Sequence, residues 1–65
     1  MNLIVNGQRL EADAADLAAL LHELDYSDRL VATAINGEFV PKDERAGTHL
    51  NEGDKIEILA PMKGG

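Results

Sequence analysis

Two Asn-Gly dipeptides place the strongest limit on the folds open to this 65-residue chain. Asn6-Gly7 and Asn36-Gly37 each stand between short runs of strand-forming residues, and both residue types accept the positive φ angles of a two-residue hairpin turn. Residues 1–12 and 30–40 are therefore predicted to form two β-hairpins. Pro41 should end the second hairpin, because proline has no backbone N–H to donate to a sheet.

One helix is predicted between the hairpins, from Asp16 to about Leu24. Asp16 suits the N-cap, since its carboxylate can accept hydrogen bonds from the free N–H groups of the first turn. The apolar residues recur at the spacing of one helical face: Leu17, Leu20, Leu21 and Leu24. A helix this short is unstable alone, so we expect its leucine face to pack on the sheet.

Apolar alternation predicts which side chains of the strands face the helix. In the first and last strands the inward set is Met1, Leu3, Val5, Ile56, Ile58 and Ala60, with Leu10 inward in the second strand. In residues 30–35, Val31, Thr33 and Ile35 share one face, and Ala32 and Ala34 share the other. Because alanine fits either face, the sequence leaves open which of these two sets is inward.

The order strand, strand, helix, strand, strand, strand predicts an α+β fold. A helical crossover between two hairpins requires a mixed five-stranded sheet with the helix on one face. The last strand, which begins at Lys55, can lie beside the first only in parallel. This arrangement is the β-grasp, or ubiquitin-like, fold. We expect residues 1–60 to form the domain and residues 61–65 to form a flexible tail.

That tail is the first candidate functional site. After Pro61 it contains Met62, Lys63, Gly64 and Gly65. Glycine is the residue least restricted in its backbone angles, and four residues reach at most about 14 Å. Such an arm could carry the Gly65 carboxylate into another protein's active site, but it is too short to fold back into a site of its own. The simpler interpretation is a frayed terminus.

The second candidate site is an apolar patch on the outer face of the sheet. If Leu3 and Ile58 face the helix, their neighbours in the sequence face away from it. The outward set beside the root of the tail is then Ile4, Leu59 and Ala34 or Ala32. A few outward apolar residues are ordinary, but a cluster at the base of a reactive arm predicts a surface where a partner docks.

Composition excludes nucleic-acid binding and favours a partner with a basic surface. Twelve acidic and six basic residues give a net charge of −6, and there is no tryptophan, so a basic stripe and a stacking platform are both lacking. An acidic surface speeds encounter with a basic one, although it also serves solubility alone. No apolar stretch could span a membrane and no signal peptide opens the chain, so we expect a cytoplasmic protein that is a monomer when alone.

The sequence does not predict an enzyme. His22 and His49 show no metal-ligand spacing, and cysteine is absent. No phosphate-binding glycine motif is present, and no base is placed beside Ser27, Thr33 or Thr48 for nucleophilic catalysis. We therefore expect no catalytic residue, no metal and no cofactor bound by this chain.

Several segments of the chain carry a family resemblance. In order they are Asn2-Leu3-Ile4-Val5-Asn6-Gly7, Leu17-x-x-Leu20-Leu21, Ala34-Ile35-Asn36-Gly37-Glu38-Phe39-Val40-Pro41, Gly53-Asp54-x-Ile56-x-Ile58-Leu59 and Gly64-Gly65. Each motif occurs in many β-grasp domains, but their order, spacing and endpoint are more specific. Over its whole length the chain resembles the bacterial sulfur carriers of thiamine biosynthesis, the ThiS family.

The resemblance implies a function, a site and partners. A ThiF-like adenylyltransferase would use ATP to adenylate the Gly65 carboxylate. A persulfide from a cysteine desulfurase or another donor would convert the adenylate into a thiocarboxylate, and thiazole synthase would accept the sulfur. ATP would then belong to the partner enzyme, and the chain itself would bind no cofactor.

Three alternatives remain at this point. One is the small subunit of molybdopterin synthase, another diglycine sulfur carrier, which is usually longer and opens with a Phe-Ala-x-x-Arg-Glu-like stretch that is absent here. Another is a ubiquitin-like modifier, which would join Gly65 to lysine side chains. The third is a β-grasp binding module with an inert tail.

Overall fold

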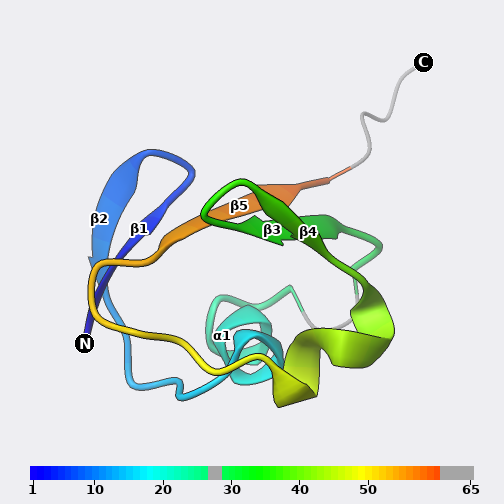
Figure 1. The fold of residues 1–65 in the computed structure, drawn as a ribbon, viewed down its shortest axis with the longest axis horizontal. Helices are drawn as coiled ribbons and strands as arrows, with labels where there is room; N and C mark the ends of the chain where they lie inside the picture. Colours follow the sequence, from blue (N-terminus) through cyan, green and yellow to red (C-terminus); the bar gives the residue numbers. More distant parts are fainter. Residues whose placement is uncertain (27–28, 61–65) are drawn as a thin grey trace.

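The computed structural model describes residues 1–26 and 29–60, which form a sheet covered on one side by helices (Figure 1). In chain order the elements are β1 (Asn2–Val5), β2 (Gln8–Glu11), α1 (Leu17–Glu23), β3 (Ala32–Ile35), β4 (Glu38–Val40), the 3-10 helix η1 (Lys42–Gly47) and β5 (Lys55–Leu59). The five strands lie in the order β2-β1-β5-β3-β4. The predicted α+β, β-grasp architecture is confirmed.

Strand β5 lies at the centre of the sheet. It pairs in parallel with β1 and antiparallel with β3, while β1–β2 and β3–β4 are antiparallel hairpins. The predicted parallel pairing of the first and last strands is therefore confirmed. Both edge strands are short, and β2 carries charged residues, which protects an edge against pairing with other chains.

Both predicted hairpin turns consist of the Asn-Gly dipeptide alone. The φ angles are 50° and 83° at Asn6 and Gly7, and 50° and 86° at Asn36 and Gly37. The residues flanking each dipeptide pair directly across the hairpin. Two successive positive φ angles match the right-handed twist of the strands, which explains why these dipeptides specify the register so strongly.

Helix α1 begins as predicted, with Asp16 as its N-cap. The Asp16 Oδ1 atom accepts the N–H of Ala19 at 2.8 Å. Glu23, at the C-terminal end of α1, accepts the N–H groups of Asp13 and Ala14 at 3.1–3.3 Å. This carboxylate therefore ties the loop before α1 to the end of the helix.

The core fills the space between α1 and the inner face of the sheet. Its buried members are Leu3, Ala12, Ala14, Leu17, Leu20, Leu21, Val31, Val40, Leu50, Ile56 and Ile58. Met1, Val5, Leu10, Leu24, Tyr26 and Ile35 pack around them. Thr33 is also buried and Ala32 is exposed, so the set containing Val31, Thr33 and Ile35 is the inward one.

Two strand boundaries differ from the sequence prediction. Strand β3 begins at Ala32 rather than at Leu30, and Leu30 is 80% exposed. The cause is the length of β5, which ends at Leu59, the partner of Ala32, and leaves no strand beside the preceding residues. Ala60, predicted to face inward, is exposed because it follows the end of the strand; that prediction was wrong.

Arg45 is buried in η1, although the sequence of this segment is mostly polar. Its Nη2 atom donates to the carbonyl oxygen of Val31 at 2.6 Å, and its Nε atom donates to Thr33 Oγ1 at 3.1 Å. The Thr33 hydroxyl donates in turn to the carbonyl oxygen of Val40 at 2.9 Å. Arg45 thus joins η1 to the start of β3 and to the end of β4.

We expect the substitution Arg45→Ala to lower the free energy of unfolding by about 2–4 kcal/mol, because it leaves buried oxygen atoms unpaired and opens a cavity. Urea denaturation would measure this loss. Lys42→Ala, an exposed position in the same 3-10 helix, is the control and should change stability by less than about 0.5 kcal/mol. Equal effects of the two substitutions would contradict a structural role for the Arg45 hydrogen bonds.

Candidate functional site

The two predicted sites adjoin each other at the end of β5. Met62, Lys63, Gly64 and Gly65 lie outside the described residues. Leu59 comes shortly before them, and 68% of its surface is exposed.

Ile4, Ala34 and Leu59 lie on the sheet face opposite α1. Their sequence neighbours Leu3 and Ile58 are buried on the helix side, and successive side chains of a strand point to opposite faces. Ile4 and Ala34 are half-buried, whereas Leu59 projects into solvent. The outward orientation predicted for these three residues is thus observed.

The register of β5 brings only two of these three residues together. Leu59 pairs with Ala32, and Ala34 pairs with Glu57, which lies two positions before Leu59. Ala34 and Leu59 are therefore diagonal neighbours, at a typical separation of about 7–8 Å. Ile4 pairs with Lys55 at the start of β5, which places it about 13 Å from Leu59 along the strand.

Phe39 extends the apolar surface to β4, on the other side of β3 from Leu59, and sequence reasoning did not assign it there. It pairs with Ala34 across the β3–β4 hairpin and is 67% exposed. The signal that could have found it is the two-residue turn, which fixes the hairpin register and makes Phe39 outward once Val40 is inward. We call Ala32, Ala34, Phe39 and Leu59 the outer patch.

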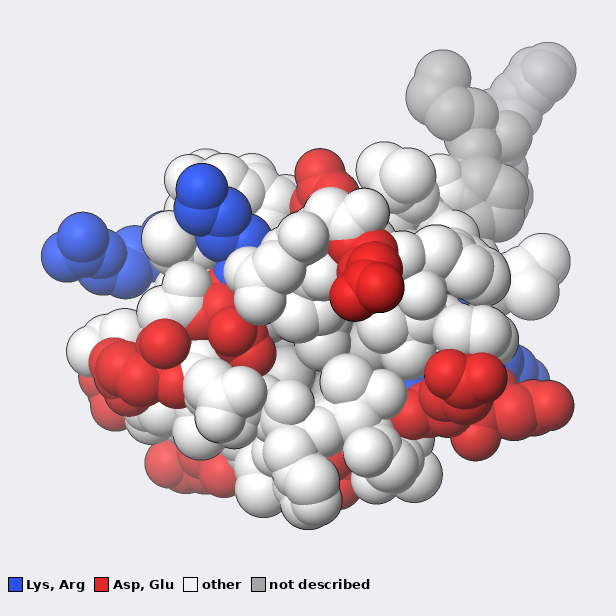
Figure 2. Space-filling model, in the orientation of Figure 1, with Lys and Arg blue, Asp and Glu red and all other residues white. Residues whose placement is uncertain are grey.

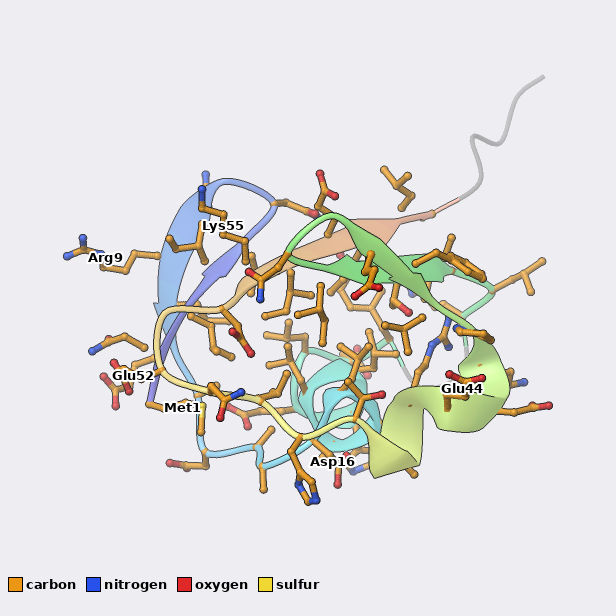
Figure 3. All side chains as sticks on the ribbon, in the orientation of Figure 1. Met1, Arg9, Asp16, Glu44, Glu52 and Lys55 are labelled. Carbon is orange, nitrogen blue, oxygen red and sulfur yellow. The ribbon has the colours of Figure 1, made fainter. Side chains whose placement is uncertain are left out.

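The opposite end of this sheet face is charged. Ile4 pairs with Arg9 on one side and Lys55 on the other, and Figure 3 shows both basic side chains near the β1–β2 hairpin. Figure 2 shows basic side chains at the upper left, and acidic side chains at the lower left and at the right. A hollow of about 620 Å³ lies between the two hairpin turns; it is lined by Ile4, Gly7, Asn36, Gly37, Lys55, Ile56 and Glu57.

The described residues contain no cluster of metal-ligand type. Across residues 1–26 and 29–60, no three His, Asp or Glu side chains lie close enough together to hold a metal ion. His22 and His49 are both exposed. No helix within those two ranges is long and apolar enough to cross a membrane.

Known proteins match this chain over its whole length. The sequence model of the ThiS family matches residues 3–65. A crystal structure of the thiamine biosynthesis protein (ThiS) from Geobacter metallireducens is 33% identical, covers both chains completely and superimposes with a TM-score of 0.83. The solution structure of a thiamine biosynthesis protein from the same organism gives 33% identity and a TM-score of 0.81, over 100% of this chain and 88% of that one.

Two curated proteins are also similar to the chain. A thiazole synthase of Paramagnetospirillum magneticum is 42% identical over a 66-residue alignment, and the chain spans 20% of the length of that protein. The uncharacterized protein ycf40 of Porphyra purpurea is 29% identical over 93% of its own length. The match of the family model to residues 3–65 and the agreement of the folds lead to one conclusion: the chain belongs to the ThiS family.

Proposed function

We propose that this chain carries sulfur as a thiocarboxylate on Gly65 and delivers it to thiazole formation. The main support is that the family match begins at residue 3 and extends through Gly65, so the Gly64-Gly65 pair belongs to the matched region. The similarity of the chain to part of a protein named thiazole synthase favours thiazole formation as the destination of the sulfur.

The chemistry begins with a carboxylate, which is a poor electrophile. A Gly65 oxygen would attack the α-phosphorus of ATP and release pyrophosphate, leaving an acyl-adenylate. The outer sulfur of a persulfide would then attack the acyl carbon, and AMP would leave. A second thiol would cleave the resulting S–S bond, which frees the thiocarboxylate on Gly65 and leaves a disulfide on the donor side.

The domain contributes positioning to these steps and its partners contribute catalysis. A ThiF-like adenylyltransferase would bind the ATP, and a cysteine desulfurase or another persulfide donor would supply the sulfur. The chain itself would bind no cofactor and act as a substrate in the cytoplasm. Glycine suits the end of such an arm, because a residue without Cβ can meet a phosphate or a persulfide without steric conflict.

We propose the outer patch as the surface on which these partners dock. Leu59 and Phe39 are the large exposed apolar side chains of this face, and Ala34 lies between them. Aromatic side chains are enriched in protein interfaces, and a cluster of exposed apolar side chains marks a surface where another protein binds. Ile4 would belong to the margin of this surface, where Arg9 and Lys55 would set the orientation of the partner.

Reconstitution followed by intact-mass measurement tests the proposed function. The chain would be incubated with ATP, a cysteine desulfurase, cysteine and a ThiF-like enzyme. A sulfur carrier should gain the mass that corresponds to one oxygen replaced by sulfur. A ladder of heavier conjugates would instead indicate a ubiquitin-like modifier, and an unchanged mass would indicate an inert binding module.

Thiazole synthase then distinguishes the two kinds of sulfur carrier. Adding this enzyme and its other substrates to the sulfur-loaded chain should return the mass of the chain to its starting value as thiazole forms. Sulfur that stays on the chain in this reaction, but is consumed by the large subunit of molybdopterin synthase, would contradict the assignment to thiamine biosynthesis.

A further inference from the structure

Asn6 holds the end of β5 with its side chain as well as with its backbone. Its backbone N–H donates to the carbonyl oxygen of Ile56 at 2.9 Å. Its side-chain Oδ1 accepts the N–H of Ile58 at 2.8 Å, and its Nδ2 donates to the carbonyl oxygen of Ile58 at 3.1 Å. One carboxamide therefore satisfies both backbone groups of a single β5 residue.

The Asn6 carboxamide makes the hydrogen bonds that a longer β1 would make to β5. The pairing of β1 with β5 ends at Val5 and Ile56, because the chain turns away at Asn6 with φ at 50°. If β1 continued in parallel, its next peptide groups would bond to Ile58. The Asn6 side chain has the same donor and acceptor as a peptide group, so it extends the pairing by one step after the backbone has left.

We infer that Asn6 is a positioning residue for the reaction at Gly65, an inference that rests on the proposed function. Without the Asn6 amide, β5 beyond Ile56 would be held only on the β3 side, through the pairing that ends with Leu59 and Ala32. Asn6 therefore fixes both the point where the chain leaves the sheet and the position of Leu59 in the outer patch. Loss of these hydrogen bonds would increase the conformational entropy of the C-terminal end of β5. Docking on a partner would then have to order that end at a cost in free energy.

Asn36 provides a matched control within the same chain. It also opens an Asn-Gly turn with φ at 50°, and its backbone N–H donates to the carbonyl oxygen of Lys55 at 2.8 Å. Its Oδ1 accepts the N–H of Lys55 at 3.0 Å, and its Nδ2 donates to Asp54 Oδ1 at 3.1 Å. Asn36 therefore binds β5 through its backbone and its side chain as Asn6 does, but at Lys55, the end of the strand remote from Leu59.

The test compares Asn6→Gly with Asn36→Gly. Glycine accepts the positive φ of both turns, so each variant loses the side-chain hydrogen bonds and retains the turn. We expect Asn6→Gly to lower kcat/KM for sulfur loading by about tenfold and Asn36→Gly by less than about twofold. We also expect amide hydrogen exchange at Ile58 and Leu59 to become faster in Asn6→Gly alone.

Asn6→Asp serves as a second variant in case Asn6→Gly folds poorly. Aspartate tolerates the same backbone angle and can still accept the N–H of Ile58, but it has no donor for the Ile58 carbonyl and adds a negative charge there. We expect its kcat/KM also to fall, while an Asn36→Asp control stays close to the parent chain.

Four results distinguish failure of the inference from failure of the proposed function. Equal losses of kcat/KM at Asn6 and Asn36 would show a purely structural role and overturn the inference. Faster exchange at Ile58 in Asn6→Gly with unchanged kcat/KM would overturn it as well. A parent chain that gains no sulfur at all would contradict the proposed function instead, and unchanged exchange at Ile58 in Asn6→Gly would then overturn the inference independently.

Discussion

We expect a chain that lacks Gly65 to load sulfur at least about 100-fold more slowly than the parent chain. The truncation shortens the arm by roughly 3.5 Å, which would hold the new terminal carboxylate short of the adenylating site. Stability should change by less than about 0.5 kcal/mol, because the buried core of the described residues runs from Leu3 to Ile58. Intact mass measures the loading, and urea denaturation measures the stability.

A chain with the Gly65 carboxylate converted into an amide is the control for arm length. It keeps every backbone atom but lacks the oxygen that would attack ATP, so it should not be adenylated. If the amidated or truncated chain still carried sulfur at the parent rate, Gly65 would not be the reacting residue. If the truncated chain unfolded, the prediction that residues 1–60 form a domain independent of the tail would be wrong.

The second large effect is expected for Leu59→Asp, which replaces a large exposed apolar side chain of the outer patch with a charge. We expect the affinity for the adenylating enzyme and for thiazole synthase to fall by about 10- to 100-fold, as for an interface residue that becomes fully buried. The free energy of unfolding should fall by about 1 kcal/mol or less, because 68% of Leu59 is exposed. Calorimetric titration against each partner measures the affinity.

Ala15→Asp is the matched control for added charge, since Ala15 is exposed in the loop before α1. This variant should bind both partners with nearly the affinity of the parent chain. Equal weakening by both substitutions would indicate a general electrostatic effect, and unchanged binding of Leu59→Asp would exclude the outer patch as the docking surface.

The features that could be predicted from the sequence are those specified by residues close together in the chain. Asn6-Gly7 and Asn36-Gly37 specify their turns through their own backbone preferences, and Asp16 caps the helix that starts beside it. The alternation in residues 55–59 shows correctly which side chains are buried. The two hairpins, the helix and the final strand together predict the mixed sheet, because few topologies connect such elements. The alternation then predicts that the Leu59 side chain faces away from the helix.

The features that could not be predicted depend on pairing between distant segments. Strand β3 begins at Ala32 only because its partner β5 ends at Leu59. Arg45 is buried only because η1 lies against the start of β3, where the Val31 carbonyl oxygen and the Thr33 hydroxyl oxygen accept its N–H groups. No local pattern distinguishes this arginine from the exposed charges around it.

Asn6 shows how one residue can have two roles of which the sequence reveals one. Its preference for positive φ identifies the turn, and any Asn-Gly pair would give the same signal. The bonds of its side chain to Ile58 appear only when β5 is placed in parallel beside β1. The same reasoning applies to Asn36 and Lys55, so both turns brace the central strand as well as reversing the chain.

We expect the transferred sulfur to be carried on the terminal carboxyl group and on no other atom of the chain. The most direct measurement is mass spectrometry of the sulfur-loaded chain after tryptic cleavage at Lys55 and Lys63. We expect the exchange of oxygen for sulfur to be confined to the released Gly64-Gly65 dipeptide. An exchange of oxygen for sulfur in any other peptide, or thiazole formed while that dipeptide never acquires sulfur, would show that the terminal carboxyl group is not the carrier.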